Sequence, residues 1–304
     1  MSVLVLGSIN LDLVVEAPRL PALGETLSGT AFHTSPGGKG ANQAVAAARQ
    51  GAPTQLIGRV GGDEFGDQLL EAVRAAGVRV SAITIDRDAR TGVALICVDP
   101  AGQNTIVTVK GANGNIGREE LALLDRLRLQ SIVLLVQLEV PLAVVTAAAE
   151  AARDAGVIVV LDPAPVTELP DALLQNVSWI TPNETEAEAL TGIEPSDTEQ
   201  AVRAAQALRE RGVDRVVITL GERGCVYAGP EMTMAVPAPR VDAIDTVGAG
   251  DAFNGALAAS IVAGRDVPGA LRAACAAGAI ACTRRGAMPS LPTAAEVEAA
   301  LADS

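Results

Sequence analysis

The residues best suited to chemistry lie in the stretch DTVGAGDAFNGA, where an aspartate follows a run of small residues. Apolar residues then recur every four positions and predict a helix that Gly264 ends. N–H groups at a helix start are free and the helix dipole favours anions there, so residues 247–250 could hold a phosphoryl group. An aspartate that only capped the helix would need no such run before it. The pattern indicates phosphoryl transfer to an alcohol, with Asp251 as the base and an anion site made by Gly248, Ala249 and Gly250.

Two polar residues at the end of the first predicted strand could bind a sugar. Asn10 and Asp12 are two positions apart, so their side chains point to the same side of an extended chain. An amide and a carboxylate in this arrangement can hold adjacent hydroxyls. The alternative is that these Asx residues end the strand in a turn.

The stretch SPGGKGANQA places a glycine pair and a lysine before an alanine-rich helix. The glycines would let the backbone approach a polar ligand closely, and Lys39 and Asn42 can bond hydroxyls or phosphate oxygens. The same glycines would also serve as a plain turn that opens the helix.

Two further motifs are compatible with a nucleotide. TPNETEAE places Asn183 and Glu186 three positions apart at a helix start, where Glu186 could organise the water around Mg²⁺, although an ordinary helix cap is the simpler interpretation. ITLGERGC places Thr219 at a strand end before Gly221 and Gly224, as a loop over a nucleotide or as a hairpin turn. The sequence has neither a Walker A loop nor a GxGxxG dinucleotide fingerprint.

Short apolar strands must position these residues. They alternate with helices rich in alanine, which predicts a parallel sheet covered by helices on both faces. In such sheets ligands bind beyond the carboxyl ends of the strands, and each of these strands ends in polar or glycine residues. The predicted strands are 131–139, 157–164, 178–184 and 215–222.

The N-terminal third has a mixed pattern. Residues 40–51 and 63–77 read as helices, and 91–110 reads as two extended runs joined at Asp99-Pro100-Ala101-Gly102. Together with 11–18 and 26–36 these runs could form a small separate sheet. We expect a single domain, 1–304, with this β extension.

Composition narrows the class of protein. The chain has 304 residues and a formal net charge of −13, which argues against nucleic acid or an acidic membrane as partner. Four scattered cysteines and one histidine give zinc few ligands. The apolar start lacks the charge and cleavage site of a signal peptide, so we expect a cytoplasmic protein.

In combination and order, these motifs resemble those of the ribokinase-like family of carbohydrate kinases. The resemblance runs from GSINLD through GGKGANQA, QLE, TPNETEAE, ITLGERG and DTVGAGDAFNGA to RRGAMPS. It implies a Rossmann-like α/β domain with a small β-sheet lid, through which two copies pair as a homodimer. It also implies ATP as donor, Mg²⁺, and activation by K⁺.

The resemblance assigns roles to individual residues, carried over motif by motif. The implied sugar ligands are Asn10, Asp12, Gly38, Lys39, Asn42, Glu139 and the base Asp251. On the nucleotide side it implies Asn183, Thr219, Gly221, Gly224, Gly250 and Cys275, with Glu186 acting on Mg²⁺ through water. The implied K⁺ loops contain Asp245, Val247, Ala281, Arg284, Gly286 and Ser290, mostly through backbone carbonyls.

The implied reaction is ATP-dependent phosphorylation of D-ribose at its 5-hydroxyl, with Ala94 and Ile96 covering the sugar. Alternatives are a kinase for deoxyribose, fructose or a nucleoside, and a sugar- or nucleotide-binding protein without catalysis. Two residues depart from the family pattern: Asp162 stands where Asn is frequent, and Cys275 where His or Asn is frequent near the adenine. Both departures bear on nucleotide preference rather than on the reaction.

Overall fold

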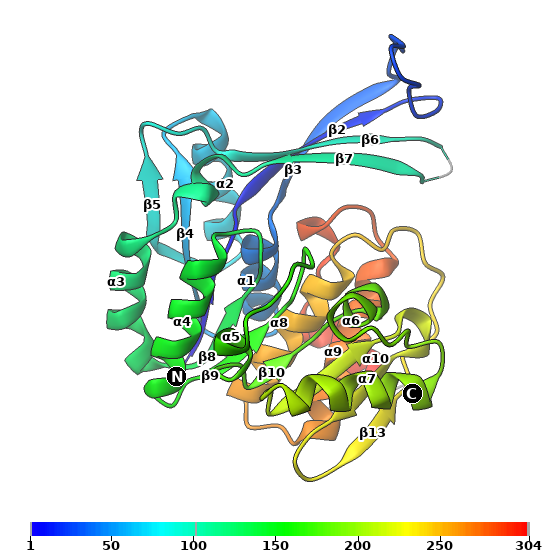
Figure 1. Ribbon diagram of the computed structural model, residues 1–304. Helices are drawn as coiled ribbons and strands as arrows, with labels where there is room; N and C mark the ends of the chain where they lie inside the picture. Colours follow the sequence, from blue (N-terminus) through cyan, green and yellow to red (C-terminus); the bar gives the residue numbers. More distant parts are fainter. Residues whose placement is uncertain (1, 101, 303–304) are drawn as a thin grey trace.

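A long central sheet organises the molecule (Figure 1). Across residues 2–100 and 102–302, which the computed structural model describes, nine strands follow the order β13-β12-β11-β10-β9-β8-β1-β4-β5. All neighbours pair in parallel except β11–β12 and β12–β13. The strands are β1 Ser2–Leu6, β4 Thr54–Gly61, β5 Arg79–Asp86, β8 Ser131–Val136, β9 Ile158–Leu161, β10 Trp179–Ile180, β11 Arg215–Thr219, β12 Cys225–Ala228 and β13 Thr233–Val236.

Helices cover both faces of this sheet, as the sequence predicts. In β1, Val3 and Val5 belong to one buried cluster, whereas Leu4 and Leu6 belong to the other. The first cluster includes residues of α1 Lys39–Arg49, α2 Glu64–Ala75, α8 Ala249–Val262, α9 Val267–Cys282 and α10 Ala294–Ala302. The second includes residues of α3 Arg118–Leu127, α4 Leu142–Asp154, α5 Asp171–Leu174, α6 Glu184–Thr191 and α7 Thr198–Glu210.

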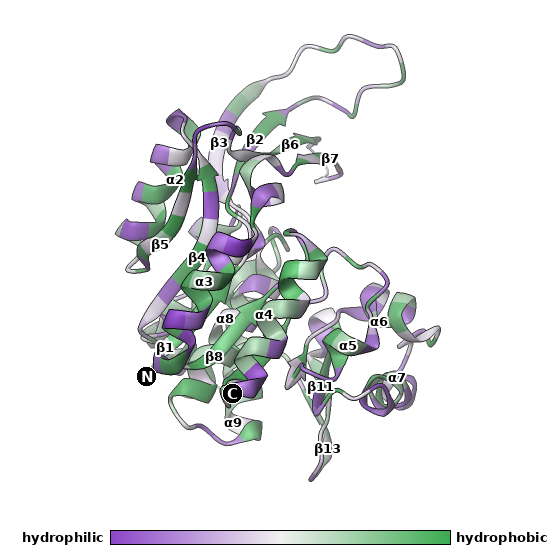
Figure 2. Cartoon of the chain, turned by 60° about the vertical axis from the view of Figure 1, so that its left-hand side comes forward, coloured by the Kyte–Doolittle hydropathy of each residue, from purple (hydrophilic) through white to green (hydrophobic). Residues whose placement is uncertain are grey.

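The hydropathy colouring follows this layering. The inner strands are green, whereas helices such as α2 and α7 carry hydrophilic residues as well (Figure 2). On α2, Leu69 and Val73 are buried against the sheet, whereas Phe65 in the first turn is exposed. None of the helices within 2–100 and 102–302 is both long enough and apolar enough for a membrane span.

A second, smaller sheet projects from the body in the order β3-β2-β6-β7 (Figure 1). Its strands are β2 Asn10–Glu16, β3 Ala31–Gly37, β6 Gly92–Val98 and β7 Asn104–Val109. The expected hairpin in 91–110 is confirmed, since β6 and β7 pair antiparallel. The expected strand at 26–36 is shifted: pairing with β2 begins at Ala31 opposite Glu16, and 26–30 form the loop that leads into it.

The register of the small sheet separates two faces. Asp12 lies opposite Ser35 and Ala94, so these residues share one face. The other face carries Val15 beside Phe32, and Leu95 beside Val107. One face therefore holds the polar residues predicted to bind sugar, and the other holds apolar side chains that are exposed.

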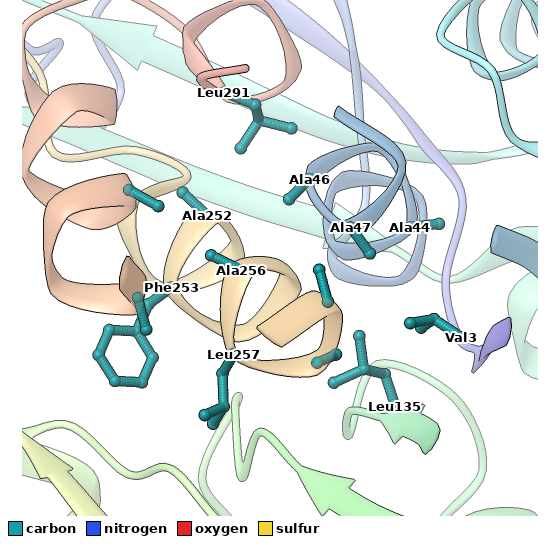
Figure 3. Close-up of a cluster of buried hydrophobic side chains, with 14 of the residues drawn as sticks. Val3, Ala44, Ala46, Ala47, Leu135, Ala252, Phe253, Ala256, Leu257 and Leu291 are labelled. Atoms are coloured by element: carbon teal, nitrogen blue, oxygen red, sulfur yellow. The ribbon is translucent and has the colours of Figure 1, made fainter. Parts of the chain in front are cut away.

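Two alanine-rich helices, α1 and α8, pack side by side (Figure 3). Ala46 and Ala47 of α1 face Ala252 and Ala256 of α8. A Cβ added to Gly255 would lie 2.3 Å from the Cβ of Ala46, so larger residues would force the helices apart. This close contact fixes the distance between the first turns of the two helices, where the polar residues lie.

Candidate active site

The predicted base lies where the first turns of α1 and α8 meet. Asp251 is only 6% exposed. Its two carboxylate oxygens accept hydrogen bonds from neighbouring residues of α1: Oδ2 from Nδ2 of Asn42 at 2.9 Å and Oδ1 from Nε2 of Gln43 at 3.1 Å. The carboxylate is thus held at both oxygens by helix α1.

The pKa of Asp251 suits a group that accepts and releases a proton near neutral pH. Burial raises its pKa to about 6, against the opposing charge of Lys39, with a further rise from Asp162. The hydrogen bonds from Asn42 and Gln43 lower the pKa and limit this rise. The group is therefore ionised at neutral pH yet basic enough to accept a proton from a hydroxyl.

A lysine supplies positive charge beside the base. Nζ of Lys39 lies 3.4 Å from Oδ2 of Asp162. Burial alone would lower the pKa of Lys39, but the carboxylates of Asp162, Asp251 and Glu139 raise it above its usual range. Burial raises the pKa of Asp162, which Lys39 opposes. Lys39 therefore remains a cation and can face phosphate oxygens.

The residues predicted to bind sugar gather on the small-sheet side of the base. Burial and the charges of Glu139 and Asp251 raise the pKa of Asp12 to about 7, which reflects the closeness of the three carboxyls. The backbone N–H of Lys39 donates to Oε2 of Glu139 at 3.1 Å. Within the described part of the chain, the buried Oδ1 of Asn42 has no hydrogen-bond partner, so it is available to a ligand hydroxyl.

A glycine with positive φ admits the backbone to this cluster. Gly38 caps α1 with φ of 88°, and a Cβ there would lie 2.7 Å from the backbone N of Asn10 and 2.9 Å from the carbonyl of Ser8. Any other residue would be strained and would collide with the strand that carries Asn10. The glycine pair thus does more than open the helix, because it brings α1 against the strand that carries Asn10 and Asp12.

Three residues that support the site through hydrogen bonds were not predicted from the sequence. Asn113 donates to Oδ1 of Asn10 at 2.8 Å, and Ser8 donates through Oγ to Glu139. Gln43 bonds Asp251, as described above. Gln43 follows Asn42 directly in a motif already singled out, whereas the contact of Asn113 spans about a hundred positions and has no local signal.

A pocket of about 1130 Å³ opens beside the first turn of α8, where Ala249 and Gly250 line it. It lies along the carboxyl end of β11 and the first turns of α6 and α8. Asn183 and Thr219 are brought together by a parallel bridge, which places α6 beside the β11–β12 turn. All residues predicted for the nucleotide line it: Asn183, Thr219, Gly221, Gly224, Gly250 and Cys275. Its size suits a nucleotide.

The predicted anion site has fewer free N–H groups than the sequence indicates. Gly248 caps α8 in the left-handed conformation with φ of 81°. The expectation that all N–H groups of 247–250 are free is wrong, because Val247 donates to Oδ1 of Asp245 at 3.0 Å and Ala249 to the carbonyl of Thr246 at 3.2 Å. Gly250 lines the pocket, and a Cβ on it would meet open space. Its N–H, in the first helical turn, is the donor best placed for phosphate.

The two loops predicted to bind K⁺, one around Asp245 and one around Gly286, lie next to each other. Oδ2 of Asp245 accepts a hydrogen bond from the N–H of Gly286 at 2.8 Å and so joins one loop to the other. Ser290 donates to the carbonyl of Ala287 at 2.8 Å. The guanidinium of Arg284 pairs with Glu296 instead, so this residue has only its backbone carbonyl to offer a cation in the loops.

Glu186 serves first as part of a helix cap. It accepts a hydrogen bond from the N–H of Asn183, and Asn183 accepts one from the N–H of Glu186, both at 2.9 Å. The simpler interpretation of this motif therefore holds for the backbone. Burial, followed by the charge of Asp162, raises the pKa of Glu186. Glu186 is not among the residues that line the pocket, although Asn183 is. Within 2–100 and 102–302, no cluster of three or more His, Cys, Asp or Glu residues could hold a metal.

A buried base between a polar sugar-side cluster and a nucleotide-sized pocket defines a kinase for small alcohols. The chain matches the pfkB family of carbohydrate kinases over residues 1–294 and belongs to that family.

Individual relatives are similar over nearly their whole length. A ribokinase from Haemophilus influenzae is 42% identical over 289 residues, covering 95% of this chain and 94% of the relative. A deoxyribokinase from Salmonella typhi is 38% identical over 297 residues, covering 96% of each. The structure of Arabidopsis thaliana ribokinase with ribose and ATP superimposes with a TM-score of 0.91 at 34% identity, covering 99% of this chain and 98% of that one.

Proposed function

We propose that this protein transfers the γ-phosphoryl group of ATP to the 5-hydroxyl of D-ribose. The observation that carries the proposal is the position of Asp251, which is buried, accepts a hydrogen bond from Asn42 of the predicted sugar site, and directly follows Gly250, which lines the nucleotide-sized pocket. A sugar held on one side and ATP on the other would place the hydroxyl, base and phosphate in line. The similarity to a ribokinase that binds ribose and ATP supports this choice of substrates.

Each group then has one task in the transfer. Asp251 takes the proton of the attacking hydroxyl as that oxygen forms its bond to the γ-phosphorus, while the bond from this phosphorus to the bridging oxygen breaks and ADP leaves. Lys39 and the N–H of Gly250 stabilise negative charge on the phosphoryl oxygens. Ala94 and Ile96, on the same face as Asp12, cover the sugar and keep water from the phosphate.

Two cations complete the proposal. Mg²⁺ would bind the phosphates of ATP and be held by Glu186 through water, because hard cations of this size retain several waters. K⁺ would lie between the loops joined by Asp245, which offer oxygen donors from the backbone and from Ser290. It would fix the start of α8 and thereby the anion site. The use of ATP also favours a cytoplasmic location.

We also propose a homodimer formed through the small sheet. The face opposite Asp12 exposes Val15, Phe32, Leu95, Val107 and Val109. A contiguous apolar patch of this kind on a sheet face indicates a protein partner, and a second copy would cover it.

The same site suits 2-deoxyribose, and the similarity to a deoxyribokinase makes this the second candidate. Release of ADP should be measured with ribose, deoxyribose, fructose and adenosine, each with Mg²⁺ and with or without K⁺. We expect the largest kcat/KM for ribose, raised by K⁺. Preference for another sugar would refute the substrate assignment, and sugar binding without ADP release would favour a non-catalytic binding protein.

A further inference from the structure

Two buried side-chain amides connect the end of strand β8 to Asp251 through hydrogen bonds. Gln137, just beyond the end of β8, donates from Nε2 to Oε1 of Gln43 at 2.6 Å. Gln43 in turn donates from Nε2 to two carboxylates, Oδ2 of Asp162 at 2.8 Å and Oδ1 of Asp251 at 3.1 Å. These residues come from four separate segments of the chain.

These hydrogen bonds fix the orientation of the Gln43 amide. Because its oxygen accepts from Gln137, its NH₂ group must face the two carboxylates, and both N–H bonds are used. Gln43 and Gln137 are fully buried, so water has no access to replace a lost partner. A turned amide would place its oxygen against two carboxylates, which is strongly unfavourable.

Gln43 and Asn42 divide the two oxygens of Asp251 between them. Asn42 bonds Oδ2 and Gln43 bonds Oδ1, so the plane of the carboxylate is fixed by consecutive residues of α1. Of these two residues, only Gln43 also donates to Asp162, and so ties Asp251 to the carboxyl end of β9. The other charged groups that act on these two carboxylates are Lys39 of α1, Asp12 of β2, Glu139 and Glu186 of α6.

We propose that Gln43, oriented by Gln137, is a positioning residue that aligns the catalytic carboxylate of Asp251 by bridging it to Asp162. The proposal rests on the function of Asp251 given above. The expectation that Asp162 bears only on nucleotide preference is then replaced by a part in the reaction: its negative charge opposes ionisation of Asp251, while the shared Gln43 amide favours it. Substitutions at Gln43 and Asp162 therefore have opposite effects on the acid limb of the pH profile.

The experiment compares kcat and KM for the best sugar across the acid limb in Gln43→Met and Asp162→Asn. Methionine keeps the length of glutamine but donates no hydrogen bond. We expect kcat to fall by roughly ten- to hundredfold in Gln43→Met, with a much smaller change in KM for the sugar. Its acid limb should move to higher pH, and that of Asp162→Asn to lower pH. A limb unchanged in Gln43→Met, or moved the same way by both variants, would overturn the proposal.

Gln55→Met is the matched control. Gln55 is a buried glutamine near the amino end of β4, where its amide donates to Ser81 of β5 at 3.2 Å. Its substitution should lower thermal stability without moving the acid limb, and an equal shift there would contradict a specific role for Gln43. If Gln43→Met does not fold, Gln137→Met takes its place with the same expected direction.

A second readout separates this proposal from the choice of reaction. Carboxyl NMR follows the ionisation of Asp251 in the wild type and in each variant, whether or not ADP is released. Absence of turnover with every sugar in the wild type would refute the proposed function alone. Titration of Asp251 at the same pH in wild type, Gln43→Met and Asp162→Asn would refute the bridging role alone.

Discussion

At the scale of single residues, the base is the first group to test. In Asp251→Asn one oxygen is replaced by an NH₂ group that must face a donor, either Asn42 or Gln43. Removal of the general base should lower kcat by about 10²-fold or more, with sugar binding less affected. Steady-state kinetics with Asp125→Asn, an exposed aspartate of α3, as control will check this. Near-full activity in Asp251→Asn would show that another group takes the proton.

Asp12 has a consequence for stability as well as for binding. Its pKa rises from 3.8 to about 7 in the folded protein, because burial and neighbouring carboxylates oppose its charge. The folded state thus binds this proton more tightly: the contribution to stability is full below 3.8 and is lost as pH rises through about 7. Above pH 7, Asp12→Asn should therefore raise Tm relative to wild type, and the difference should vanish in acid. A lower Tm at every pH would contradict this.

At this scale the sequence predicted which residues of the candidate site lie together. Asp251, Lys39 and Asn42 lie together as expected, since each sits in a motif whose types and spacing are informative by themselves. Asn113 could not be found in this way, because its only role is to hold Asn10 from a distant segment. The number of free N–H groups at the anion site was overestimated, because two of them donate hydrogen bonds within local turns. Composition alone does not reveal these bonds.

At the scale of elements, the strand–helix alternation predicted the parallel sheet and the edge where the site lies. Strand ends were less predictable. Residues 26–30 have strand-like composition, yet the partner β2 ends at Glu16, so pairing starts only at Ala31. Boundaries of this kind depend on how far the neighbouring strand extends, and a single segment does not contain that information.

The left-handed conformation of Gly248 at the start of α8 can be tested by substitution. Gly248→Ala forces a Cβ into a left-handed conformation and to 3.0 Å from Cα of Ala287, at a cost of about 1–2 kcal/mol. We expect lower thermal stability and a loss of kcat, because the first turn of α8 must shift. Gly264→Ala is the control: its φ is 74°, it ends the same helix, and a Cβ there meets open space. Equal kinetic losses in both variants would contradict a local role of Gly248 in catalysis.

At the scale of the whole molecule, the exposed face of the small sheet predicts the oligomeric state. Phe32→Asp combined with Val107→Asp places two charges on that face, where they would be desolvated in a dimer. Light scattering should show a dimer for the wild type and a monomer for the double variant. Leu129→Asp, an exposed apolar residue beyond the end of α3, should remain dimeric. A monomeric wild type would refute the assembly.

The direct passage from β1 into β2 divides the catalytic centre between two parts of the molecule. Only residues 7–9 separate these strands, so Asn10 and Asp12 belong to the small sheet, whereas Asp251 belongs to α8. Sugar should therefore slow amide hydrogen exchange in β6 and β7, and unchanged exchange would contradict this coupling. If the small sheet swung away from the central sheet, it would withdraw Asn10 and Asp12 from Asp251. The enzyme would then be assembled only while it is closed, and ATP bound to the open form would meet an incomplete catalyst.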